Sequence, residues 1–261
     1  MNGDLTLAIP CESNDKQFII ALNRTLFRVE WDGQNNYNIS EVLTVVDKDK
    51  PNNRFNDGKA DKEGRLWLGT MGRNNAGEII DINYGSLYLV TNETIDNPQA
   101  VVHPVNISNG MAWNTANDKF YFIDTTADQI TEYDFDNGSG NISNPRVVFD
   151  VNSFSDRITG HPGGMTIDND GKLWIALYGG GAVVQFDPEE EKILQIISIP
   201  ATYVTSVCWG GDNYEILFVT TSRFLLTEDE KVKEPAAGSI FIATDLGVQG
   251  VPTYRSKVVK S

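Results

Sequence analysis

The densest group of polar side chains in the sequence is Asn52-Asn-Arg-Phe-Asn-Asp-Gly-Lys59. Alternate residues of an extended strand face the same side, so an extended conformation predicts that Arg54 and Asn56 lie together. A guanidinium offers a fixed fork of donors and a carboxamide both donates and accepts. Together they suit a polyhydroxylated or anionic small molecule. An Asx-rich surface turn is the alternative, and composition alone favours it.

Asn109 and His161 are further candidates, and both lie in glycine-containing segments. The Asn109-Gly110 pair favours a turn, although an Asn carbonyl can also coordinate a hard divalent ion such as Ca²⁺. His161 could act as a base or a ligand, but a single His beside Pro in a glycine-rich loop is more typical of an exposed side chain without a role. The two segments occupy matching places in a repeat, so both are expected at the same end of the structure.

Other catalytic motifs are poorly supported. Neither a G-x-S-x-G motif nor a P-loop is present, and two histidines give little support to a Ser/His/Asp triad. Asp168-Asn-Asp-Gly171 begins like an EF-hand loop, but the distant Glu is missing and a hairpin turn is favoured. Any chemistry is therefore predicted to be metal-assisted. Cys11 and Cys208 form no C-x-x-C motif and are expected to be free thiols.

The charge balance argues against some classes of partner. With 21 basic and 36 acidic side chains the net charge is −15, which repels phosphate and argues against a nucleic acid or an anionic membrane. No apolar run approaches the ~20 residues that span a bilayer, and the first residues show no basic region followed by an apolar one. The sequence therefore predicts a cytoplasmic protein.

A repeat of about fifty residues indicates the fold class. Trp67, Tyr121, Trp174 and Phe218 stand in matching turn-strand units, spaced by 54, 53 and 44 residues, and a weaker copy places Phe18 another 49 residues upstream. Each unit is followed by a second alternating segment, which is typical of antiparallel strands joined by tight turns. The sequence therefore predicts an all-β fold, a β-propeller of four-stranded blades. The 261 residues accommodate about five such blades.

The chain resembles the regucalcin (senescence marker protein), gluconolactonase and luciferin-regenerating-enzyme family. The segments that carry the resemblance are residues 52–59, 69–71, 107–110, 162–165, 172–174 and 246–250. Residues 23–33 are similar to the luciferin-regenerating branch, which suggests an insect-type member. The resemblance implies a six-bladed propeller over a single domain, residues 1–261, with most of the first blade absent from this chain.

The same resemblance implies hydrolysis of sugar lactones with one divalent cation, Ca²⁺, Zn²⁺ or Mn²⁺, held by a Glu, an Asn and an Asp. Carried over, Asn109 is the metal ligand and Arg54 and Asn56 contact the sugar lactone. Asn74 stands where the family has a substrate-side acid, and Gly163 stands where it has the metal-binding Asp. The Glu would precede Met1, so two metal carboxylates are missing and no catalytic residue is assigned. The expectation is an impaired lactone hydrolase, with a non-catalytic or regulatory propeller as the alternative.

Overall fold

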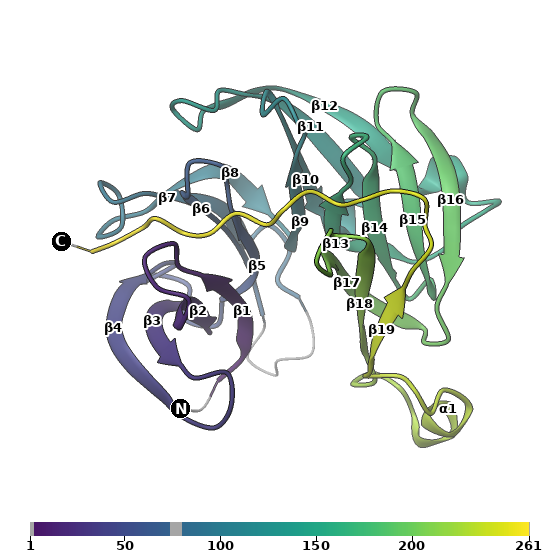
Figure 1. The fold of residues 1–261 in the computed structure, drawn as a ribbon, viewed down its shortest axis with the longest axis horizontal. Helices are drawn as coiled ribbons and strands as arrows, with labels where there is room; N and C mark the ends of the chain where they lie inside the picture. Colours follow the sequence, from purple (N-terminus) through teal and green to yellow (C-terminus); the bar gives the residue numbers. More distant parts are fainter. Residues whose placement is uncertain (1–2, 74–79, 261) are drawn as a thin grey trace. The chain divides into compact units, whose positions relative to one another are not determined.

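The structure is a computed structural model that describes residues 3–73 and 80–260 (Figure 1). Its contacts divide the chain into two compact units. The first comprises Met1–Ser108, Asn137–Asn141 and Tyr254–Ser261, and the second comprises Asn109–Asp136 and Ile142–Thr253. Among the described residues no helix is long and apolar enough to cross a membrane.

The first unit contains two four-stranded antiparallel sheets, each formed by consecutive strands in the orders β1-β2-β3-β4 and β5-β6-β7-β8 (Figure 1). The strands are β1 (Leu5–Pro10), β2 (Gln17–Leu22), β3 (Thr25–Trp31), β4 (Tyr37–Val45), β5 (Arg54–Ala60), β6 (Leu66–Met71), β7 (Gly85–Val90) and β8 (Gln99–Val105). The apolar side chains of both sheets share one buried cluster, which includes Ile19, Leu26, Phe55 and Leu68. Packing within this cluster holds β5, the strand with the polar motif, in place.

The second unit contains a four-stranded sheet, β9-β10-β11-β12, and a seven-stranded sheet formed by β13 to β19. A single residue pair, Tyr178 with Tyr203, joins the run β13–β16 to the run β17–β19. The strands are β9 (Ser108–Trp113), β10 (Lys119–Asp124), β11 (Gln129–Phe135), β12 (Ile142–Asp150), β13 (His161–Ile167), β14 (Leu173–Tyr178), β15 (Ala182–Asp187), β16 (Lys192–Ser198), β17 (Tyr203–Gly210), β18 (Ile216–Ser222) and β19 (Ile240–Ala243). The short helix α1 (Glu228–Lys233) lies between β18 and β19 in the chain (Figure 1).

The predicted repeat is confirmed at the level of strands. The aromatic residues that define it, Phe18, Trp67, Tyr121, Trp174 and Phe218, fall on β2, β6, β10, β14 and β18, the second strand of each run. Trp67 and Trp174 are fully buried. The spacing therefore reports one structural unit copied along the chain.

A buried aspartate fixes the turn before two of these second strands. Asp168 is fully buried, and its carboxylate accepts hydrogen bonds from the backbone N–H groups of Asp170 and Lys172, at 3.0 and 2.8 Å. The indole Nε1 of Trp174 and the amide Nε2 of Gln185 donate to its second oxygen at 2.9 and 3.1 Å. The predicted hairpin turn at residues 168–171 is thus correct, and the carboxylate has a structural role.

Asp61 repeats this arrangement in the first unit. It accepts from the backbone N–H of Arg65 at 3.0 Å and from the indole of Trp67 at 3.0 Å. At the third equivalent position Asn114 accepts from two backbone N–H groups of its turn, and the residue six positions on is Phe120. The two turns that precede a Trp therefore have an Asp, whose second oxygen binds the indole. The turn that precedes Phe120 has an Asn, whose oxygen binds the backbone.

We expect Asp168→Asn to lower the free energy of unfolding by roughly 3 kcal/mol, because the new amide group would face the donors of Trp174 and Gln185. Urea unfolding followed by fluorescence measures this change. Asp170→Asn removes the same charge from an exposed residue of the same turn and serves as the control. Equal losses in the two variants would contradict a specific role of the buried carboxylate.

Candidate functional site

Two predicted site residues lie in β-bulges. In β5, Phe55 pairs with Thr70 and Gly58 pairs with Leu68, so Asn56 and Asp57 together face one residue of β6, Gly69. A bulge leaves an extra residue outside the regular pairing and turns side chains in a new direction. The polar motif therefore lies on a strand with a bulge, and not in the surface turn that composition favoured.

The equivalent bulge in β13 contains Gly163. Pro162 pairs with Leu177 and Met165 pairs with Ile175, so Gly163 and its neighbour face one residue of β14. The repeat therefore carries the same irregularity at the same place in both units.

Arg54 and Asn56 contact each other, as strand alternation predicts. A guanidinium nitrogen of Arg54 donates to the side-chain oxygen of Asn56 at 2.9 Å, and to the carbonyl oxygen of Phe55 at 2.8 Å. The amide nitrogen of Asn56 donates to the carbonyl oxygen of Ser108 at 3.0 Å. Both side chains are half-buried, so their orientation is fixed before any ligand arrives.

Asp57 is a titratable group in the same bulge. The backbone N–H of Gly58 donates to its carboxylate at 2.7 Å. Burial raises the pKa of Asp57, while the charge of Lys59 and the hydrogen bond from Gly58 act in the opposite direction. A buried carboxyl group with a raised pKa beside polar side chains is a candidate for proton transfer, so Asp57 is kept as a candidate acid or base.

Asp4 and Arg73 join this cluster, and sequence reasoning missed both. Asp4 precedes β1 and forms ion pairs with Arg73 and with Arg54, the latter at 3.7 Å between Oδ2 and Nε. Asp4 and Arg73 are 69 residues apart, and no local pattern in the sequence links them. Asn74 lies outside the described residues, and its predicted role in substrate binding stays a prediction.

In the second unit, Asn109 and His161 each contact a polar side chain. The amide nitrogen of Asn109 donates to the hydroxyl of Thr125 at 2.9 Å, so its carbonyl oxygen is oriented away from that contact. The Nδ1 atom of His161 lies 2.6 Å from a carboxylate oxygen of Asp128. Because a carboxylate only accepts, Nδ1 is the donor in this contact. His161 is exposed, as expected, but the Asp128 partner was not foreseen.

Gly163 is held tightly by its surroundings. A Cβ atom at this position would lie 2.8 Å from the carbonyl oxygen of Thr205, closer than side chains tolerate. A carboxylate therefore cannot be added here without a shift of backbone. The packing of β13 against β17 is therefore tight at the position where the resemblance implies an Asp.

The described side chains do not fit the predicted divalent ion. Among them no group of three His, Cys, Asp or Glu residues could hold a metal. Asn109 offers one neutral oxygen, and Ca²⁺, Zn²⁺ and Mn²⁺ sites in proteins use several ligands with carboxylate or imidazole donors. No step through an ion follows from this donor set.

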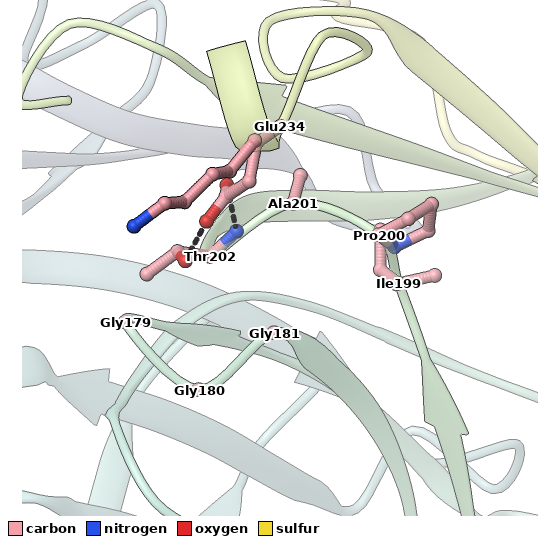
Figure 2. A pocket seen from close by; sticks show the side chains of 9 residues that line it. Gly179, Gly180, Gly181, Ile199, Pro200, Ala201, Thr202 and Glu234 are labelled. Atoms are coloured by element: carbon pink, nitrogen blue, oxygen red, sulfur yellow. Dashed lines mark hydrogen bonds between the residues drawn. The ribbon is translucent and has the colours of Figure 1, made fainter. Parts of the chain in front are cut away.

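A hollow of about 360 Å³ lies elsewhere in the second unit, beside three consecutive glycines, Gly179 to Gly181 (Figure 2). The carboxylate of Glu234 accepts hydrogen bonds from the hydroxyl and the backbone N–H of Thr202, the second at 2.7 Å. Figure 2 shows these bonds on one wall, with the glycines opposite. Because the carboxylate is used in this way, it fastens the segment after α1 to the start of β17. None of the predicted site residues lines this hollow.

The repeated antiparallel runs define the class of protein. The chain is a β-propeller, the fold of the solved structures that it resembles. A luciferin-regenerating enzyme matches it with a TM-score of 0.88 at 32% identity, over 99% of this chain and 83% of that one. A regucalcin from Agrobacterium tumefaciens, described as a calcium-binding protein, has the same fold, with a TM-score of 0.84 at 24% identity over 99% and 81% of the two chains.

Sequence comparison gives the particular family. The model of the SMP-30/Gluconolactonase/LRE-like region matches residues 1–223, and the chain belongs to this family. Regucalcin of Oryctolagus cuniculus is 42% identical over 213 residues, which span 82% of this chain and 69% of the rabbit protein. The resemblance seen in the sequence motifs is therefore correct.

The raised pKa of Asp57 predicts a pH dependence of stability. An unfolded Asp titrates near pH ~3.9, so protonated Asp57 stabilises the fold fully below that pH, and this contribution is lost as the pH rises through the higher folded-state pKa. Asp57→Asn stays neutral. As the pH rises above 4, the free energy of unfolding of the wild type should fall relative to that of Asp57→Asn.

Urea unfolding at several values between pH 4 and pH 8 measures this difference. Asp15→Asn, a change at a side chain that is 88% exposed, is the control and should show no such trend. A constant difference between Asp57→Asn and the wild type across this range would show that Asp57 is ionised throughout.

Proposed function

We propose that this protein acts on small polyhydroxylated lactones, as a lactone hydrolase of the gluconolactonase and regucalcin class whose activity is impaired. The observation that carries the proposal is the contact between Arg54 and Asn56 in the bulge of β5. It holds a guanidinium beside an amide, and such a pair can bind the hydroxyl and carbonyl oxygens of a sugar lactone with its remaining hydrogen-bonding capacity. Family membership supports the same class of substrate.

The impairment is inferred from the missing carboxylate. The relatives include an enzyme and a protein described as calcium-binding, and Gly163 supplies no ligand atom where the family resemblance expects an Asp. The described donor set is therefore too weak to hold an ion by itself. This favours the second candidate function, a non-catalytic propeller that binds a small polar ligand through Arg54 and Asn56.

His161 supplies a base that needs no ion. Asp128 fixes the imidazole so that Nε2 can take a proton from water, as the oriented histidine of a catalytic triad does. The water oxygen then forms a bond to the lactone carbonyl carbon, and the ring C–O bond breaks. The proton passes to the leaving oxygen, and the product is a hydroxy acid.

Turnover of gluconolactone, measured without added ion and with Ca²⁺, Zn²⁺ or Mn²⁺ added singly, tests the proposal. We expect a slow rate above buffer that falls about a hundredfold in His161→Gln, the lower end of general-base effects. His103→Gln changes the other histidine of the chain, which contacts Ser86, and should leave the rate unchanged. A rate equal to buffer under every condition would eliminate the hydrolase and leave the binding protein.

Gly163→Asp and Gly163→Ala separate packing from metal chemistry. Both add a Cβ atom against Thr205, and we expect each to cost about 1–3 kcal/mol of stability, as overpacking does. Gly163→Asp alone should regain thermal stability when Ca²⁺ or Zn²⁺ is added, because its carboxylate adds a ligand to the Asn109 oxygen. Equal responses of the two variants to both ions would place residue 163 outside any metal site.

A further inference from the structure

The cluster around Arg54 carries one inference beyond lactone binding. We infer that Arg54 and Arg73 form a carboxylate-binding site that the chain's own Asp4 occupies, and that the natural ligand is an acidic sugar derivative. The inference names the class of ligand for the proposed function and rests on it. All the residues of this cluster belong to the first unit.

Two guanidinium groups converge on one carboxylate oxygen. A guanidinium nitrogen of Arg73 and the Nε of Arg54 both pair with Oδ2 of Asp4. Arginine binds carboxylates best when two parallel N–H groups meet two oxygens. Asp4 uses one oxygen to contact two guanidinium groups. A carboxylate that used both of its oxygens would therefore bind Arg54 and Arg73 better.

Hydrogen bonds to Asn23 hold the backbone of Asp4 near Arg54. Its backbone N–H donates to the side-chain oxygen of Asn23, and the backbone N–H of Asn23 donates to its carbonyl oxygen, both at 3.0 Å. The carbonyl of Asn23 in turn accepts from the backbone N–H of Phe55 at 2.6 Å, beside Arg54. The main chain at Asp4 is thus tied to the start of β5. Its side chain is still 47% exposed, so a ligand in solution can compete with it.

The electrostatics of Arg54 favour a further anion. Burial lowers the pKa of Arg54, the charge of Arg73 lowers it further, and Asp4 acts in the opposite direction. Two half-buried cations that repel each other are stabilised when an anion sits between them. Asn56 is hydrogen bonded to another nitrogen of the same guanidinium group, and its amide can bind a hydroxyl of such a ligand.

Three ligands of one carbon skeleton test the inference by isothermal titration calorimetry: D-glucitol, D-gluconate and D-glucarate, with zero, one and two carboxylates. We expect the two acids to bind the wild-type protein more tightly than glucitol. Asp4→Asn should tighten gluconate binding about tenfold, since the internal competitor loses its charge, and leave glucitol unchanged. Arg73→Gln should remove the preference for acids.

Asp15→Asn is the matched control, because it removes an Asp that also pairs with an arginine, in the turn between β1 and β2. It should leave all three affinities unchanged. If Asp4→Asn leaves gluconate binding unchanged, or tightens gluconate and glucitol equally, Asp4 is only a structural ion pair and the inference fails. The titrations contain no lactone, so a protein that fails to hydrolyse lactones can still pass this test.

Discussion

The turn carboxylates of Asp61 and Asp168 are the constraint on which the rest of the structure depends. Each is fully buried and satisfies the N–H groups of its own turn and an indole of the strand that follows. A buried carboxylate with all its partners in place is stable, whereas one left without them is costly, so the turn has one geometry. That geometry sets the register between the first and second strands of a run. In a strand, a slip by one residue would exchange the two faces.

Register in turn decides where the bulges fall. The strand β5 spans Arg54–Ala60, so the turn at Asp61 is one strand length, about 20 Å, from the residues that contact a ligand. The bulge at residues 56 and 57 faces Gly69, where a Cβ atom would lie 1.8 Å from the Ser108 hydroxyl, so a glycine is needed for Ser108 to lie where its carbonyl accepts from Asn56. The chemistry at one end of the strand therefore depends on a fixed turn at the other end and on a glycine across from it.

The sequence could predict features that arise within one chain segment, but not contacts between residues that lie far apart in the sequence. The aromatic repeat and the contact between Arg54 and Asn56 arise from periodicities of one chain segment, and both were predictable. The pairs Arg73–Asp4 and His161–Asp128 join residues 69 and 33 positions apart, and the repeat gives no signal for them. The raised pKa of Asp57 depends on burial within the bulge, which alternation alone cannot show, since it assigns Asp57 simply to the other side of the strand.

The same reasoning explains how a protein with a net charge of −15 can favour an acidic ligand. Its overall field repels anions, but at physiological salt that field is screened beyond about 8 Å. Inside this distance the sign of the potential is set by the nearest groups, which are the two guanidiniums facing Asp4. The Asp4 carboxylate keeps the two guanidinium groups ordered without a ligand and competes with weakly binding anions. A ligand must therefore supply what Asp4 does not, a second carboxylate oxygen and adjacent hydroxyls, and selectivity comes from local geometry rather than from net charge.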